Sequence, residues 1–323
     1  MLAFLRLIRL PNLLIIAFTQ YMIRFCMMDP ILRLSGFELQ LPEWEFALLV
    51  LGTTFIAAGG YIINDYFDVR IDAINKPDEL VIDHGVKRRV AMGAHAVLSI
   101  LGVAMGAFIS WRSGILLSGG ALFALSVAGL WYYSTTFKYK FLTGNLLISL
   151  LTAVVPFMAV LFEIPRLIVH YNKELILQVN QYGFGTTTTL LLWAGAYTVF
   201  AFGLSMVREM IKDMEDVEGD KEYGCRTIPI ALGIQKAKLI TYALILLIIA
   251  GVGYSQNYLH GQLKEMYSVL YFAVLVQLPL LFIIFRLLKA ETKKDFHTAS
   301  VFVKVIMLAG ICFLFFLRFY LLK

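Results

Sequence analysis

Nine mainly apolar stretches, each long enough to cross a lipid bilayer, follow one another along this 323-residue chain. A helix needs roughly 20 such residues to span the hydrocarbon core. They lie near residues 13–30, 44–63, 90–110, 114–133, 143–162, 186–207, 238–256, 266–287 and 300–321. Hydrophobic residues make up 60% of the chain and charged residues only 15%. The sequence therefore predicts an all-α, polytopic membrane protein that forms a single transmembrane domain over residues 1–323.

Lysine and arginine are distributed unevenly between the loops on the two predicted sides of the membrane. With the N-terminus inside, the loops of the inner face carry 19 of the 28 basic residues and those of the outer face carry 6. Cytoplasmic loops are enriched in such residues. We therefore expect a multi-pass protein of the cell membrane with a cytoplasmic N-terminus. This bias and anionic lipid account for the net charge of +6, so nucleic acid binding is not expected.

Two acidic clusters follow the second and sixth apolar stretches, on the predicted cytoplasmic face. Both read Asp-x-x-Asp-x-x-x-Asp, and their aspartates are Asp65, Asp68, Asp72, Asp213, Asp216 and Asp220. Spacings of three and four place carboxylates on one face of a helix, where like charges repel. A hard divalent cation removes this cost, and Mg²⁺ often binds carboxylates together with substrate phosphates and water. The pattern predicts a diphosphate bridged by Mg²⁺ at the membrane surface.

Basic residues accompany both clusters on the same predicted face. Those we expect to contact the substrate are Arg70, Lys76, Lys138, Arg208, Lys212, Lys221 and Arg226. Lysine and arginine pair with phosphate oxygens, while carboxylates hold the metal. Together they would stabilise the charge that develops as diphosphate leaves. For Lys138, a role in orienting the chain in the membrane is an alternative explanation.

With their neighbours, the clusters read Asn64-Asp65-x-x-Asp68-x-x-x-Asp72 and Asp213-x-x-Asp216-x-x-x-Asp220. These motifs resemble the paired signatures of the UbiA superfamily of intramembrane prenyltransferases, and the resemblance covers nearly the whole chain. It implies nine helices around a central cavity, with Mg²⁺ and an isoprenyl diphosphate between the motifs. By this resemblance the six aspartates would be catalytic. The metal ligands would be drawn from Asn64, Asp68, Asp72, Asp213, Asp216 and Asp220.

Further positions extend the resemblance to particular substrates. Arg9 and Asn12, near the start of the first span, match a polar pair that the family places at its cavity. The stretch Tyr133-Ser134-x-x-x-Lys138, followed by Gly144-Asn145, resembles the branch that prenylates geranylgeranylglyceryl phosphate. The resemblance thus adds Tyr133 and Asn145 to the expected substrate-binding residues. It implies transfer of a geranylgeranyl group to that lipid.

One departure from the family pattern bears on the acceptor. The family commonly has Asn-x-Pro-x-Arg-Pro after the first motif, whereas this chain has Asn75-Lys76-Pro77-Asp78-Glu79-Leu80. Glu79 stands where an arginine is expected. An aromatic acceptor of quinone biosynthesis, such as dihydroxynaphthoate or hydroxybenzoate, therefore remains an alternative to the lipid.

A cation transporter is an alternative of another class. Transporters place charged residues near the middle of the membrane, whereas these acidic clusters lie at helix ends, which favours the transferase. A phosphotransferase that acts on a nucleotide-activated lipid is a further alternative. Proteins of that class carry an Asp-Gly-x-x-Ala-Arg signature, which is absent from this sequence. The expected partners are an isoprenyl diphosphate, a lipid or aromatic acceptor and the bilayer, with no obligate protein partner.

The locations of three segments that connect the spans can also be predicted. Residues 64–89 and 208–237 are expected to form cytoplasmic loops that carry the motifs, and residues 163–185 an external, partly helical segment at the membrane interface. Arg24 and Lys304 are among the charged residues that fall inside predicted spans. A charge there is costly and often functional, although a long side chain can also reach an interface.

Overall fold

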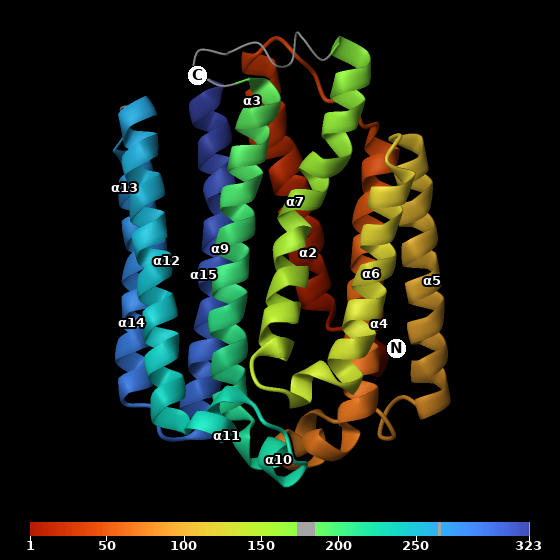
Figure 1. Ribbon diagram of the computed structural model, residues 1–323, viewed down its shortest axis with the longest axis vertical. Coiled ribbons are helices and arrows are strands. Elements are labelled where there is room, and N and C mark those ends of the chain that lie inside the picture. Colours follow the sequence, from red (N-terminus) through yellow and green to blue (C-terminus); the bar gives the residue numbers. More distant parts are fainter. Residues whose placement is uncertain (173–184, 264–265, 323) are drawn as a thin grey trace.

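The computed structural model describes residues 1–172, 185–263 and 266–322, and these form a bundle of long helices (Figure 1). Nine segments of the described chain are long and apolar enough to cross a membrane. The described residues contain no β-strand, and Ile82 forms an isolated bridge with Val86. The prediction of an all-α, multi-pass membrane protein is therefore confirmed.

Most of the spans are single helices, and two are interrupted by a π-helical turn. The first span consists of α2 (Leu10–Met22), a π-helical turn (Ile23–Met28) and α3 (Asp29–Leu34). The eighth consists of α13 (Tyr267–Phe272), a π-helical turn (Ala273–Gln277) and α14 (Leu278–Leu288). The others are α4 (Glu43–Asn75), α5 (Arg88–Arg112), α6 (Leu116–Thr135), α7 (Thr143–Tyr171), α9 (Thr186–Glu215), α12 (Ile234–Leu263) and α15 (Lys293–Leu321). Shorter pieces are α1 (Leu2–Leu7), α10 (Val217–Glu222), α11 (Ile228–Leu232) and 3₁₀ turns at Pro77–Glu79 and Phe137–Tyr139.

Helix α4 is longer than the membrane is thick, and this places the first acidic motif at a surface. Its 33 residues extend about 50 Å, at about 1.5 Å per residue, whereas the hydrocarbon core is about 30 Å thick. Glu43 and Glu45 lie in the first turn, and the residues from Asn64 onward form the last turns. The apolar middle of the helix can therefore cross the bilayer while its polar C-terminal end projects beyond it.

The regions 64–89 and 208–237, expected to be loops, are in large part helical. The first continues α4 as far as Asn75, so the helical spacing expected for the first motif holds throughout it. In the second region, α9 ends at Glu215 and the chain turns at Asp216 into α10. Figure 1 shows α10, α11 and the last turns of α4 at the same end of the bundle, and α10 contacts α4.

Buried ion pairs hold the opposite end of the bundle together. Glu45 of α4 is fully buried and contacts both Arg112 of α5 and Arg166 of α7. Arg24, which is 2% exposed, lies 3.2 Å from Glu163 of α7. A buried charge is tolerated only when it is paired. These contacts therefore explain the charge in the first span and fix α4 against α5 and α7.

The predicted external segment 163–185 begins inside the bundle. Residues 163–171 continue α7 as regular helix, and Glu163 is fully buried in its ion pair. The part of the prediction that concerns residues 173–184 lies outside the described residues.

Glycines allow α4, α5 and α6 to pack closely. A Cβ atom added to Gly102 of α5 would lie 2.6 Å from the Ile56 side chain of α4. One added to Gly106 would lie 2.2 Å from the Phe123 ring of α6. Small residues of this kind let helices approach one another in membranes. This close packing fixes the lateral position of α4, and with it the first acidic motif.

Gly106→Ala should weaken the contact between α5 and α6, because the new methyl group overlaps the Phe123 ring. Overpacking typically costs about 1–3 kcal/mol, so the purified protein should unfold at a lower temperature in a thermal scan in detergent. Gly93→Ala is the matched control, since a Cβ at this position of the same helix meets no atom within 4 Å. Equal unfolding temperatures for the two variants would contradict the packing.

Candidate active site

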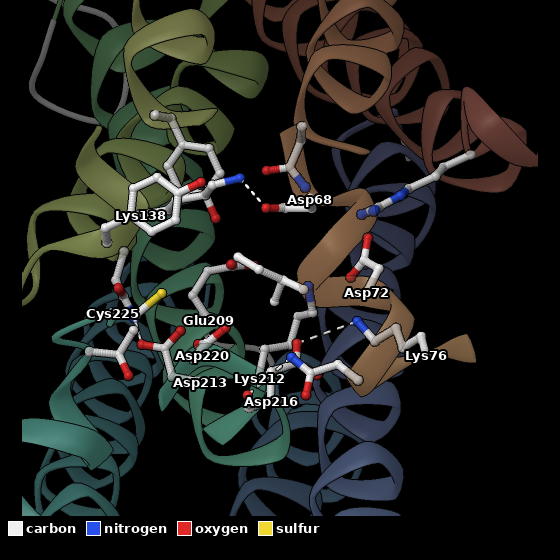
Figure 2. Close-up of a pocket in the computed structure, with 18 residues that line it drawn as sticks. Asp68, Asp72, Lys76, Lys138, Glu209, Lys212, Asp213, Asp216, Asp220 and Cys225 are labelled. Carbon is white, nitrogen blue, oxygen red and sulfur yellow. Dashed lines mark hydrogen bonds and ion pairs between the residues drawn. The ribbon is translucent and has the colours of Figure 1, made fainter. Parts of the chain in front are cut away.

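The two acidic motifs line one cavity at the end of the bundle that carries α10 and α11 (Figure 2). Six motif residues contribute to its wall: Asn64, Asp68 and Asp72 from α4, and Asp213, Asp216 and Asp220 from α9, the turn after it and α10. The motifs are far apart in the sequence, so only the fold brings them together. Their convergence suits a single ligand held between them.

In the first motif, each polar side chain has a different environment. Asp68 forms an ion pair with Lys138 from the 3₁₀ turn after α6 (Figure 2). Asp65 does not line the cavity and instead accepts a 2.8 Å hydrogen bond from Nη2 of Arg9. The Oδ1 atom of Asn64 is buried and has no hydrogen-bond partner in the described residues. A buried polar atom without a partner is costly, so Asn64 is available to a ligand.

The second motif crowds its carboxylates. Asp213 accepts a 2.8 Å hydrogen bond from Nδ2 of Asn145 in α7. The Oδ2 atom of Asp216 lies 3.4 Å from Nζ of Lys76, and its Oδ1 atom is buried with no partner in the described chain. Burial first, and then neighbouring carboxylates including Asp216, raise the pKa of Asp220 to about 7. A cation placed among these groups would offset this repulsion.

Asn75, the last residue of α4, ties the two motifs together. Its Nδ2 donates to the backbone carbonyl of Asp216 at 3.1 Å, and its Oδ1 accepts from the backbone N–H of Gly219 at 3.0 Å. Gly219 leaves room for this contact, because a Cβ there would lie 2.7 Å from the Asn75 amide. Lys293, the first residue of α15, donates to the backbone carbonyl of Asn75. These bonds fix the second motif against the first.

Arg9 brings a fixed positive charge to the cavity wall. It lies between α1 and α2 with φ 51° and ψ 53°, a left-handed conformation that few residues other than glycine adopt. Its guanidinium pairs with Asp65 and lies 5.0 Å from the centroid of the Tyr61 ring. Backbone strain of this kind is concentrated at functional sites, where the surrounding structure imposes it.

The structure separates the predicted substrate-binding residues into two groups. Those that line the cavity are Arg9, Lys76, Tyr133, Lys138, Asn145 and Lys212. Those that are not part of its wall are Asn12, Arg70, Arg208, Lys221 and Arg226. Arg70 is two residues from both Asp68 and Asp72, so it lies on another side of the helix, and it is exposed. Lys221 and Arg226 are exposed as well.

Several wall residues were not predicted from the sequence. They are Ile71, Asn75, Tyr139, Glu209, Cys225 and Thr227. Glu209 precedes Asp213 by one helical turn, and Asn75 follows Asp72 by nearly one, so helical spacing could have indicated both. Tyr139, Cys225 and Thr227 come from turns and loops, where no spacing rule applies.

Cys225 lines the cavity but is poorly suited to act as a nucleophile. Burial, followed by the negative charges of Asp220 and Asp68, raises the pKa of its thiol to about 12. The thiolate is the reactive form of cysteine. Cys225 is therefore neutral near neutral pH and serves as part of the wall.

The wall suits a divalent cation that arrives together with phosphate. No three His, Cys, Asp or Glu residues in the described ranges are grouped closely enough to hold a metal ion by themselves. Mg²⁺ usually keeps water and substrate phosphates in addition to a few carboxylates. The buried, partnerless Oδ1 atoms of Asn64 and Asp216 are oxygen donors of the kind that it requires. Lys76 and Lys138 also line the cavity (Figure 2), and lysine is a residue that pairs with phosphate oxygens.

Comparison with known proteins decides the family. The UbiA prenyltransferase family model matches residues 35–308, a region that contains both acidic motifs. The chain belongs to the UbiA prenyltransferase family. It is thus a prenyltransferase, and the resemblance inferred from the paired motifs is confirmed.

Relatives of this prenyltransferase agree in fold over nearly their whole length. The digeranylgeranylglyceryl phosphate synthase of Thermococcus gammatolerans is 30% identical over 285 residues, which cover 84% of this chain and 86% of that protein. A solved structure of a digeranylgeranylglyceryl phosphate synthase has 23% identity and a TM-score of 0.59, and the match covers 97% of this chain and 98% of that chain. A UbiA homologue from Archaeoglobus fulgidus bound to GPP and Mg²⁺ has 16% identity and a TM-score of 0.52, with coverage of 97% and 99%.

Asn75→Ala should slow prenyl transfer by about tenfold, a usual cost of removing a residue that orients metal ligands. Gly219→Ala should also slow it, because its methyl group would displace the Asn75 side chain. The double variant should be no slower than the slower single variant, since truncation of Asn75 makes room for the methyl group. Losses in kcat/KM that multiply in the double variant would contradict this coupling.

Proposed function

We propose that this prenyltransferase moves a geranylgeranyl group from geranylgeranyl diphosphate to geranylgeranylglyceryl phosphate. The acceptor is supported by relatives that are digeranylgeranylglyceryl phosphate synthases, one of which is 30% identical over 84% of this chain. The structural observation that carries the proposal is the mixed charge of the cavity wall. Carboxylates of both motifs alternate there with Lys76, Lys138 and Lys212. Such a wall suits a diphosphate together with its metal.

The proposed metal is Mg²⁺, with ligands drawn from Asn64, Asp68, Asp72, Asp213, Asp216 and Asp220. It is supported by the partnerless oxygens of Asn64 and Asp216 and by the Archaeoglobus fulgidus homologue that binds Mg²⁺ with GPP. When bound, Mg²⁺ would supply stabilisation of the negative charge on the departing diphosphate. Asp65 would act indirectly, through the position of Arg9.

Two lysines of the cavity pair with motif carboxylates and could contact the diphosphate while a metal neutralises those carboxylates. Lys138 pairs with Asp68, and Lys76 pairs with Asp216. When a metal and a diphosphate are bound together, the carboxylates would hold the metal and the two lysines would contact phosphate oxygens. The side chain of Lys212 makes no hydrogen bond or ion pair in the described residues and offers a further cation.

Transfer breaks the C–O bond between the geranylgeranyl group and diphosphate and forms an ether bond to the acceptor hydroxyl, which loses its proton. Positive charge on the allylic carbon requires a dry, polarisable neighbour. Tyr133 of α6 lines the cavity, whereas Trp131 and Tyr132 of the same helix are exposed. We assign the role of cation neighbour to Tyr133 for this reason.

The cavity end of the bundle is proposed to face the cytoplasm, together with the N-terminus. The support is the excess of lysine and arginine in the loops of this end. Membership in a prenyltransferase family favours prenyl transfer over cation transport as the function of the chain.

Asp68→Asn and Asp213→Asn should each lower the rate of prenyl transfer by at least about a hundredfold, as expected when a group that stabilises transition-state charge is lost. Both changes keep the shape of the side chain and remove its charge. Asp78→Asn is the control, because Asp78 is exposed beside the first motif and does not line the cavity. Full activity in either motif variant, measured with labelled donor, would contradict the site.

A panel of acceptors tests the proposed substrate. Purified protein should transfer labelled geranylgeranyl from its diphosphate to geranylgeranylglyceryl phosphate, and not to dihydroxynaphthoate or hydroxybenzoate. Chelation of divalent metal should stop the transfer, and added Mg²⁺ should restore it. If the labelled product is a quinone precursor and not a lipid, the chain belongs to the aromatic branch. Transfer that persists after chelation would refute the role of the metal.

A further inference from the structure

Lys304 is a charged residue inside a membrane span that the proposed reaction leaves without a role. It lies in the middle of α15 and is half-buried, and its side chain makes no hydrogen bond or ion pair within the described residues. A charge within a span is costly, so it usually serves an ion pair, a ligand or a transport path. Unlike Arg24 at the other end of the bundle, which pairs with Glu163, Lys304 has no carboxylate in contact with it in the described part of the chain.

The charged groups within electrostatic range of Lys304 are mostly positive. The largest contributions come from the cations Arg208, Lys212 and Arg9, followed by the carboxylate Glu209. Glu209 is already engaged, because its Oε1 lies 2.5 Å from Nη1 of Arg208. The Nε atom of Arg208 is buried and has no partner in the described residues. Arg208 and Lys304, from the neighbouring helices α9 and α15, therefore carry one positive charge more than Glu209 neutralises.

This excess lies level with the membrane-side end of the acidic motifs, because Lys304 follows Lys293 in α15 by as many residues as Asn64 precedes Asn75 in α4. Lys293, at the start of α15, contacts Asn75 at the motif level. Lys304 lies about 16 Å further along the helix, at about 1.5 Å per residue. Arg208 precedes Asp213 by five residues in α9, or about 8 Å at the same rise. An anion held here would lie beside the reacting end of a prenyl chain whose diphosphate occupies the motifs.

We infer that Lys304 and Arg208 form a second anion site, which binds the phosphate monoester of the acceptor lipid. The inference rests on the proposed function, since it names the group by which this acceptor is recognised. The two sites differ in the groups that they offer to an anion. The motif cavity would hold the diphosphate with carboxylates and a metal, whereas the site at Lys304 and Arg208 offers only the positive charges of the protein. A phosphate monoester suits it, because it carries nearly two charges near neutral pH and arginine presents a planar pair of donors to its oxygens.

The test compares two acceptors that differ only in the phosphate: geranylgeranylglyceryl phosphate and geranylgeranylglycerol. The protein is placed in phosphatidylcholine nanodiscs, so that the acceptor supplies the only phosphate monoester. Initial rates give the KM for each acceptor and for geranylgeranyl diphosphate in wild type, Lys304→Met and Lys304→Arg. Lys294→Met is the matched control, because Lys294 is exposed in the first turn of the same helix.

Lys304→Met should raise the KM for the phosphorylated acceptor by about tenfold, the usual cost of one charge-assisted hydrogen bond. The KM for geranylgeranylglycerol and for the diphosphate donor should stay unchanged. Lys304→Arg should restore the preference for phosphate, and Lys294→Met should behave as wild type. Unchanged unfolding temperatures would show that Lys304→Met still folds.

Two results would overturn the second site while leaving the proposed function intact. One is an equal rise in KM for both acceptors, and the other is a rise for the donor alone, which would assign Lys304 to the diphosphate. If Lys304→Met does not fold, Lys304→Gln carries the test: a raised KM for the phosphorylated acceptor, with an unchanged donor KM, supports the site, and values identical to those of wild type oppose it. Absence of transfer by wild type to either lipid would refute the proposed function itself.

Discussion

The fold of this protein depends on how it accommodates carboxylates at the ends of two membrane helices. Six motif residues from α4, α9 and α10 line one cavity, and burial with mutual repulsion raises the pKa of Asp220 to about 7. Lysines from separate turns, Lys76 and Lys138, pair with two of these carboxylates. Such pairs leave both partners able to accept a metal and a diphosphate in exchange. The same electrostatic cost therefore explains the shape of the cavity and the chemistry proposed for it.

The packing of the helices serves this arrangement at both ends of the bundle. Away from the cavity, Glu45 joins α4 to Arg112 and Arg166, so the start of the motif-bearing helix is fixed by buried charge. At the cavity, Asn75 bonds to the backbone of the second motif at Asp216 and Gly219. Because α4 is held at both ends, the first motif cannot move independently of the second.

The fold could be predicted from the sequence to a large extent, because length and apolar composition determine which segments cross a membrane. The first motif was also predictable, since its residues lie in one helix with regular spacing. The geometry of the second motif was less predictable. A turn at Asp216 interrupts its helix, and apolar periodicity does not indicate such a break. Residues such as Tyr139 and Thr227 reach the cavity through tertiary contacts alone. Arg70 shows the converse, because proximity in sequence predicted it at the site, whereas its side chain is exposed and does not line the cavity.

The central claim is that one metal–diphosphate complex joins the two motifs. Anomalous scattering from Mn²⁺, in crystals grown with a non-hydrolysable geranylgeranyl diphosphate analogue, measures it most directly. The account predicts anomalous peaks inside the cavity, with metal contacts to residues of both α4 and the α9–α10 region and the diphosphate between them. Peaks confined to one motif, or located outside the cavity, would contradict it.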